Sequence, residues 1–438
     1  RRRAEPAPQG PGRAGPSHRN NLVWVLSAAL VAATLLALAG VQATRFSSSV
    51  AFCGKTCHEP MAPTYTAYRD SAHATVACAD CHVSAGVAGF VEAKVSGLRE
   101  AWGVTGGSYD RPIVASMDEL PPTSDTCSGC HPAPLTLTPE PHRLAVFRPD
   151  EANTAEQIEL SLKSSASATA TDGNIGIDWH HNLDHRITYV ALDAELQQIP
   201  WIQVKRWDGN VTEYRTEDDD ITAEQLASLP RHRLDCVTCH NRTGHRFDPP
   251  SMAVNRALAA DEISATLPWA KSTVMAALVH SYGDRDTAHR GLGEAIKATY
   301  RDKQPELLAT RGADIQKAAA AAVTIYDRNA FPEMRIDWQT YPDNIGHHHW
   351  PGCFRCHDER HRSTDDQPLS MSCTLCHDEP RRVPAGPSAD GSTAIAAEWH
   401  PWDMPAEHLE IKEHDQLLCH ECHQPGHRPR SACEDCHR

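Results

Sequence analysis

The sequence lacks the features that mark several large classes of protein. Asp and Glu outnumber Lys and Arg, 57 to 42, and the formal net charge is −15 at pH 7. An acidic chain repels phosphate backbones, so no nucleic acid partner is expected. No P-loop, dinucleotide-binding or Ser-His-Asp pattern is present. Only one apolar run is long enough to cross a bilayer, which excludes a polytopic membrane protein.

Aromatic residues are also scarce, at 6% of the chain, whereas the 438 residues include 16 cysteines and 27 histidines. Every cysteine belongs to a pair that is followed at once by histidine, so none is left over. One pair, Cys53–Cys57–His58, has three residues between its cysteines. The other seven have the form C-x-x-C-H: Cys78–Cys81–His82, Cys127–Cys130–His131, Cys236–Cys239–His240, Cys353–Cys356–His357, Cys373–Cys376–His377, Cys419–Cys422–His423 and Cys433–Cys436–His437.

This spacing matches the covalent attachment of haem c. Two thiols at this separation reach the two vinyl groups of one porphyrin, and the next histidine supplies the proximal iron ligand. Zinc sites and disulfides are the alternatives, but neither requires a histidine after every cysteine pair. We therefore predict eight haem c groups, each with its motif histidine as the proximal ligand.

The remaining histidines are numerous enough to supply second axial ligands. Eight of the 27 belong to the motifs, and a globular chain of this length does not normally carry so many others. At least one ligand is expected from His180, His181 and His185, with His181 selected, and another from the triplet at 347–349. Candidates chosen by position elsewhere are His73, His142, His245, His361, His400 and His408.

A single apolar run, Leu22–Val41, precedes the first motif. About 20 apolar residues cross a bilayer as a helix. Five arginines come before the run, and only Arg45 follows it closely. The positive-inside rule therefore predicts a single-pass protein of the cytoplasmic (inner) membrane, with a cytoplasmic N-terminus and a periplasmic haem domain. A signal peptide cleaved near Val41-Gln42-Ala43 is the alternative. The sequence does not begin with Met, so residues before Arg1 are expected.

The spacing of the haem motifs along the sequence divides the chain into regions. We expect a tail at 1–20, a transmembrane anchor at 21–45, a three-haem module at 46–140, an insertion with a β hairpin at 141–235, a single-haem helical region at 236–352 and a four-haem module at 353–438. The predicted fold class is mainly α-helical and irregular, wrapped around haems, with one transmembrane helix and a small central β subdomain.

The central region carries the signals for that β subdomain and for the helices after it. Asp208-Gly209 within Val204–Arg215 predicts the turn of a hairpin. Ser251–Val279 and Gly291–Tyr326 have helical periodicity, and the alanine-rich Ala318–Val323 is interpreted as helix-packing surface.

Two segments, residues 52–102 and YPDNIGHHHWPGCFRCHDERH at 341–361, resemble the NapC/NirT family of membrane-anchored cytochromes. The resemblance implies quinol oxidation and electron transfer to periplasmic redox proteins. It implies Met61 as an axial ligand of the first haem, which leaves open whether His58 also binds that iron, and it selects His347 from the triplet. It also indicates Lys94 and Glu100 beside the quinol headgroup. Small members carry four haems, so eight motifs and a long insertion before Cys236 depart from that pattern.

Three functions remain open from the sequence. The first is a conduit that oxidises membrane quinol, in which case the protein is a quinol dehydrogenase. The second is a catalytic reductase of a small nitrogen or sulfur compound, and the third is an electron-transfer subunit of a larger respiratory complex. Because every motif ends in histidine and histidines are in surplus, an open iron is not expected. The sequence does not fix the oligomeric state.

Overall fold

The computed structural model describes residues 18–56, 58–113, 120–131, 142–163, 176–181, 186–206, 208–216, 221–347, 349–372, 375–378, 380–384 and 395–396. The predicted motifs Cys419–His423 and Cys433–His437, the candidates His400 and His408, and also Cys57 and Cys373 lie outside these residues.

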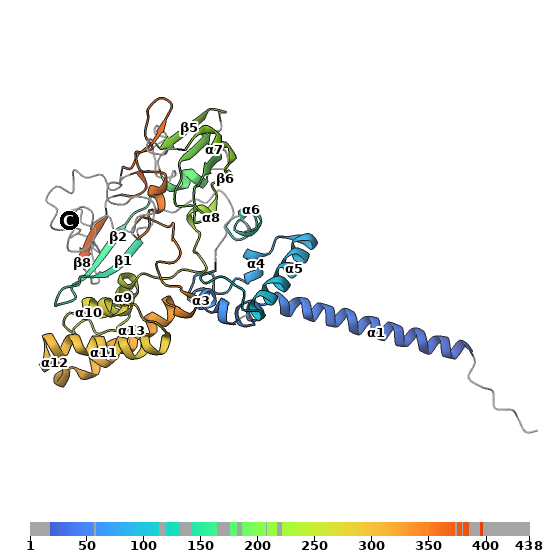
Figure 1. Ribbon diagram of the computed structural model, residues 1–438, viewed down its shortest axis with the longest axis horizontal. Helices are drawn as coiled ribbons and strands as arrows, with labels where there is room; N and C mark the ends of the chain where they lie inside the picture. The colour runs from blue at the N-terminus through green and yellow to red at the C-terminus, as the bar shows by residue number, and fades with distance from the viewer. Residues whose placement is uncertain are drawn as a thin grey trace, which may run out of the picture.

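A long helix, α1 (His18–Ser47), extends away from the rest of the chain (Figure 1). Its span Leu22–Ser47 is, among the described residues, the one helix long and apolar enough to cross a membrane. Apolar side chains along α1, such as Trp24 and Leu36, are exposed rather than packed on protein, as a lipid-facing helix requires.

Short helices that carry the first motifs follow α1. They are α2 (Val50–Lys55), α3 (His58–Arg69), α4 (Cys78–His82), α5 (Gly86–Thr105) and α6 (Thr123–Thr126). The N-cap of α2 is Ser49, whose side chain accepts a hydrogen bond from the Phe52 backbone N–H at 3.1 Å. This cap begins α2 directly after the membrane helix ends.

Antiparallel sheets are formed by strands that lie between His142 and Ala396. The larger has the order β6-β3-β4-β5-β7 and is built from His232–Arg233, Arg186–Val190, Trp201–Lys205, Val211–Thr216 and His361–Ser363. The predicted hairpin is confirmed: β4 pairs antiparallel with β5, and Gly209 in the turn has a φ of +86°. That left-handed conformation favours glycine, which explains the Asp-Gly signal.

The second sheet was not expected from the sequence. It has the order β1-β2-β8-β9, formed by His142–Phe147, Ala155–Leu160, Arg381–Pro384 and Ile395–Ala396. Strands β7 and β8 therefore join the region after Cys353 to both sheets.

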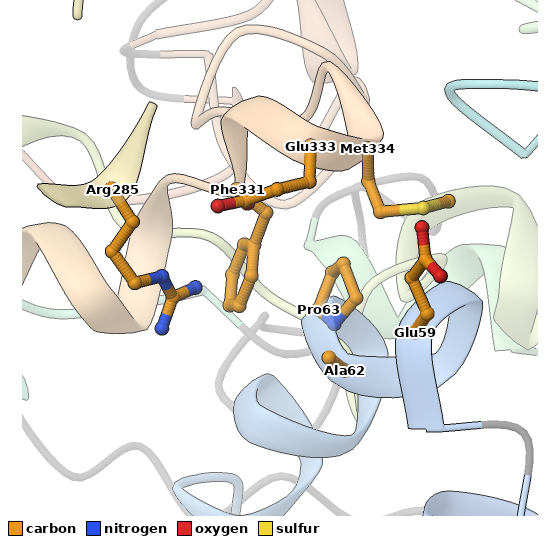
Figure 2. A pocket seen from close by; sticks show the side chains of 7 residues that line it. All are labelled: Glu59, Ala62, Pro63, Arg285, Phe331, Glu333 and Met334. Carbon is orange, nitrogen blue, oxygen red and sulfur yellow. The ribbon is translucent and has the colours of Figure 1, made fainter. Parts of the chain in front are cut away.

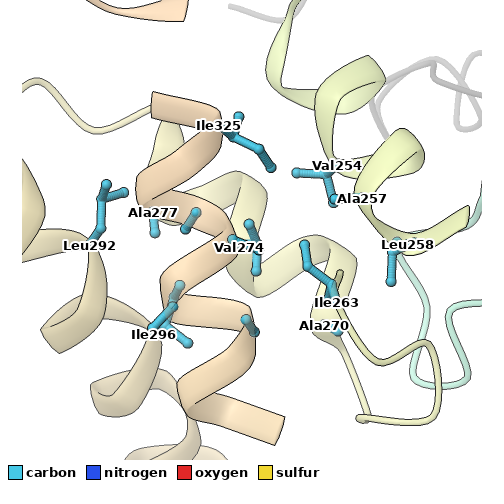
Figure 3. Packing of buried hydrophobic residues seen from close by; sticks show 14 of the residues in the cluster. Val254, Ala257, Leu258, Ile263, Ala270, Val274, Ala277, Leu292, Ile296 and Ile325 are labelled. Atoms are coloured by element: carbon cyan, nitrogen blue, oxygen red, sulfur yellow. The ribbon is translucent and has the colours of Figure 1, made fainter. Parts of the chain in front are cut away.

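A helical bundle lies between β6 and β7 in the chain. It contains α9 (Pro250–Ala259), α10 (Ala270–Leu278), α11 (Arg285–Lys303), α12 (Pro305–Thr310) and α13 (Gly312–Asn329). Its core is packed from fully buried residues such as Val254, Val274, Leu292 and Ile296 (Figure 3). Ala318 and Ala322 are fully buried in the same cluster, which confirms the alanine-rich segment as packing surface.

The remaining elements are short. The helices α7 (Ala223–Ser228) and α8 (Cys236–Cys239) lie before the bundle in the chain, and single 3-10 turns occur at Ile177–His181, Pro332–Met334 and Gly352–Arg355. The fold is thus helical with one candidate membrane helix and a sheet region.

Candidate haem sites

Several cysteine motifs fold as one helical turn. Cys78–His82 is the helix α4. The backbone N–H groups of His131, His240 and His357 each donate to the carbonyl of the first cysteine of their motif, at 2.8, 2.8 and 3.0 Å. Residues three and four apart share one face of a helical turn. Both thiols and the histidine ring therefore point to the same side, as attachment to one porphyrin requires.

The described residues do not favour the two alternative uses of cysteine. The cysteines whose side chains are described are free thiols rather than disulfides. Among the described residues, no group of three or more His, Cys, Asp and Glu side chains is arranged to hold a metal ion. A zinc site needs four such ligands.

Four motif histidines each face a second histidine from elsewhere in the chain. The distances between ring centroids are 5.9 Å for His82 and His245, 6.0 Å for His357 and His180, 6.2 Å for His131 and His73, and 6.2 Å for His377 and His347. A metal–imidazole bond is about 2 Å long, so two imidazoles on opposite faces of one iron have centroids about 6 Å apart. These pairs fit haem iron between them.

In four of these rings Nδ1 lies close to a backbone carbonyl oxygen. Nδ1 lies 3.1 Å from the Thr64 carbonyl oxygen in His245 and 3.1 Å from the Ile177 carbonyl oxygen in His180. The corresponding distances are 2.9 Å in His357 and 2.6 Å in His377, again to backbone carbonyls. Because a carbonyl only accepts, Nδ1 carries the proton and Nε2 keeps its lone pair, which is the usual tautomer of a metal-ligating histidine.

Burial favours the neutral form of three of these rings. It lowers the pKa of His245 to about 4, and it also lowers the pKa values of His82 and His357. A neutral imidazole is the form that binds iron. In His73, Nδ1 is buried and has no hydrogen-bond partner among the described residues. This ring nitrogen is therefore not engaged by a described protein group, as binding to iron requires.

Three of the predicted second ligands, His73, His245 and His347, therefore lie opposite motif histidines. At the DWHHNLDH cluster the paired ring is His180, the neighbour of the selected His181, whose side chain is not described. His142 is exposed at the start of β1.

The His361 ring has a different environment, because both of its nitrogens are hydrogen-bonded within the protein. Its ring is 1% exposed, with Nδ1 2.7 Å from Asp358 Oδ1 and Nε2 2.7 Å from the Ile199 carbonyl oxygen. Both nitrogens are bonded to protein oxygens, so this ring has a structural role at the edge of the five-stranded sheet.

Contacts between neighbouring motifs follow the order of the sequence. After burial, the nearby thiol of Cys53 contributes to raising the pKa of Cys78. Cys127 acts in the same way on Cys81, and Cys376 on Cys353. Each of these effects requires the two thiols to lie close together.

Direct hydrogen bonds join the third, fourth and fifth motifs. Thr123 lies just before the third motif, and its hydroxyl donates to Asp235 Oδ2 at 3.4 Å. Asp235 directly precedes the first cysteine of the fourth motif. Arg355, between the cysteines of the fifth motif, donates to the backbone carbonyl of Thr238 in the fourth at 2.8 Å. The sequence alone does not indicate that Arg355 joins two motifs, because an arginine inside a motif carries no signal of burial.

Residues predicted near the membrane lie in α3 and α5. Met61 is one turn after His58 in α3, on the same helical face. Lys94 Nζ donates to the Ser47 carbonyl, the last residue of α1, at 2.9 Å. Glu100 is exposed and accepts from Ser96 at 3.0 Å. The structure thus brings Lys94, but not Glu100, into contact with the end of α1.

A cavity of about 270 Å³ lies beside α3 (Figure 2). Its wall from α3 includes Glu59, which also forms an ion pair with Arg111 at 2.9 Å. The opposite wall comes from the end of the bundle. The lining residues are Glu59, Ala62, Pro63, Arg285, Phe331, Glu333 and Met334.

Motif turns, opposed histidines and a membrane helix define the class of a membrane-anchored c-type cytochrome. Residues 16–189 match the model of the NapC/NirT cytochrome c family, N-terminal region. A relative, the cytochrome c-type protein ImcH of Geobacter sulfurreducens, is 33% identical over 363 residues, which are 83% of this chain and 71% of that protein. No solved structure matches.

This chain belongs to the NapC/NirT cytochrome c family, and the predicted resemblance is confirmed. It is a membrane-anchored electron-transfer protein that carries covalently bound haem c.

Proposed function

We propose that this protein is an octahaem cytochrome that oxidises membrane quinol and passes the electrons to a periplasmic redox protein. Quinol oxidation releases two electrons and two protons, and the haem irons take up electrons one at a time. The eight motifs support the count of eight haems. The family and the N-terminal helix support an inner-membrane protein with a cytoplasmic N-terminus.

The observation that carries the proposal is the set of four histidine pairs, with ring centroids 5.9 to 6.2 Å apart. We assign His245, His73, His180 and His347 as the second ligands of the second, third, fifth and sixth haems. His180 replaces His181, and His361 is removed because both of its ring nitrogens are occupied. Met61 is assigned to the first haem, and His142, His400 and His408 remain candidates for the fourth, seventh and eighth.

With six-coordinate irons, no coordination position is left for a small substrate. This favours electron transfer over the alternative of a reductase of nitrogen or sulfur compounds. The contacts between consecutive motifs, from Cys53–Cys78 to Cys353–Cys376, support a relay in sequence order from the three-haem part at 46–140 towards the four-haem part at 353–438.

We place quinol oxidation at the membrane surface, beside the first haem and Lys94. The contact between Lys94 and Ser47 supports this position, because α1 leaves the bilayer at its C-terminal end. In this proposal the Lys94 ammonium donates to a quinol oxygen, Glu100 accepts one of the two released protons, and the other passes to water. Exchange of the Ser47 carbonyl for the quinol oxygen costs Lys94 little, since both are hydrogen-bond acceptors.

The test is reduction of the purified protein in detergent by a water-soluble menaquinol analogue. We expect haem reduction without any partner subunit, eight haems by pyridine haemochrome analysis and intact mass, and a wholly low-spin spectrum. A subunit without its own quinol site would be reduced by dithionite but not by quinol. A high-spin iron in the native protein would favour the reductase instead.

A further inference from the structure

The helix α5 carries a row of exposed apolar side chains. Exposed fractions are 82% for Val87, 52% for Val91, 53% for Val95, 73% for Leu98 and 82% for Trp102. At 3.6 residues per turn these five positions fall within an arc of about 80°. We call this row the α5 stripe. Large apolar side chains gathered on one helical face mark a surface that is covered in the working protein.

The other faces of α5 have different chemistry. Phe90 and Lys94 are half-buried against the protein, and Lys94 Nζ lies 5.0 Å from the centre of the Phe90 ring. Ser96 and Glu100 are exposed on the side away from the stripe, and Arg99 is exposed beside it. One face thus packs on protein, one is polar and exposed, and the stripe is apolar and exposed.

The helix that carries the stripe contacts the end of the membrane helix. Lys94, at the middle of α5, is hydrogen-bonded to Ser47 at the end of α1. In Figure 1 α5 lies near the end of α1 and does not continue along its axis. An amphipathic helix of this kind buries its apolar face at the boundary between headgroups and acyl chains.

We infer that the α5 stripe is a second membrane contact, immersed in the lipid interface beside the anchor. Trp102, at the end of the stripe, has the amphipathic ring that is enriched at this depth. Lipid is favoured over a second copy of the chain because the surface is a single narrow row, whereas a stable protein interface needs about 1,000 Å² or more. The inference requires α1 in the bilayer but does not require quinol oxidation.

The test uses the full haem-loaded protein in vesicles of phosphatidylcholine and phosphatidylglycerol that contain a lipid with a photoreactive diazirine in its acyl chain. After illumination, labelled residues are located by mass spectrometry. Peptides of α1 serve as the positive control, and Trp269 in the bundle, 38% exposed, serves as the exposed apolar control away from α5. We expect labelling at Leu98 and Trp102 at least fivefold above that at Trp269.

Two matched variants separate lipid contact from helix stability. Leu98→Glu introduces one negative charge into the stripe, and Ser96→Glu introduces the same charge on the polar face. Leu98→Glu should reduce labelling of α5 severalfold with α1 labelling unchanged, whereas Ser96→Glu should leave both unchanged. If α1 is labelled but the stripe carries no more label than Trp269, protein rather than lipid covers it and the inference is wrong. Absence of label from both helices would overturn the membrane anchor as well.

Discussion

Replacing Arg355 by methionine should weaken the junction between the fourth and fifth haem motifs and lower the reduction potentials of both haems. The Arg355 side chain is almost fully buried, with 3% of its residue surface exposed. Its guanidinium donates to the carbonyls of Gly352, Leu196 and Thr238, at 3.0, 2.8 and 2.8 Å. A cation fixed between two haem motifs disfavours the more positive oxidised irons, so its removal should favour oxidation.

The three hydrogen bonds set the size of the stability effect. Bonds from a charged donor contribute about 1.5 to 3 kcal/mol each. The Thr238 carbonyl keeps a second donor, Asn344 Nδ2 at 3.0 Å, so its loss is partial. Leu196 and Gly352 lose the guanidinium donor. We expect Arg355→Met to cost about 3 to 5 kcal/mol in the free energy of unfolding.

The assay combines denaturant unfolding, followed by Soret circular dichroism, with a potentiometric titration of the haems. Arg355→Lys separates the two roles, because lysine keeps the charge but cannot reproduce the three-way fork. It should lose stability while its potentials fall less than those of Arg355→Met. Arg362, a half-exposed partner of Asp366 at 3.0 Å, provides the control, and Arg362→Met should change stability by less than about 1 kcal/mol. If Arg355→Met matches that control in both measurements, the buried cation does not join the two motifs.

Other substitutions test the ligands, the second sheet and the quinol site. His245→Ala should convert one low-spin haem to high spin in the electron paramagnetic resonance spectrum, whereas His361→Ala should lower stability and leave every haem low-spin; the reverse result would invalidate the assignments. The hydrogen bond from Arg381 lowers the pKa of Glu159, so its stabilising effect is present above the unfolded value of about 4.3 and is lost as pH falls through the lowered folded value. Thermal midpoints of wild type and Glu159→Gln should therefore differ at pH 7 and converge in acid, and a constant difference would contradict this. Lys94→Met should slow haem reduction by quinol at least tenfold with dithionite reduction unchanged, and equal quinol rates would remove Lys94 from the site.

Local patterns were sufficient to predict the features that depend on neighbouring residues. The C-x-x-C-H spacing determines a helical turn, so the positions of the thiols and motif histidines follow from the sequence. The hairpin follows from Asp208-Gly209, because Gly209 adopts the left-handed conformation that such a turn needs. The membrane helix follows from the length of its apolar run.

Features that depend on distant segments were harder to predict. His180 and His181 are adjacent in one 3-10 turn, where a shift of one residue changes the direction of a side chain completely. The pairing of β2 with β8 has no local signal, because strand register is determined by tertiary packing. His361 was a reasonable ligand by position, but Asp358, three residues before it, and the Ile199 carbonyl occupy both of its nitrogens.

The histidine pairs also connect parts of the chain that the motif density separates. His245, from the single-haem region, faces His82 of the three-haem region, and His180, from the insertion, faces His357 of the four-haem region. With the proposed ligands, each of these haems requires two regions to be folded together, since one region supplies the thioethers and the other supplies the second ligand. In the proposed relay the long insertion therefore supplies an iron ligand rather than being a separate addition. By the same reasoning, loss of one such haem should disturb a region that contains none of its cysteines, because the second ligand would be left buried without its metal partner.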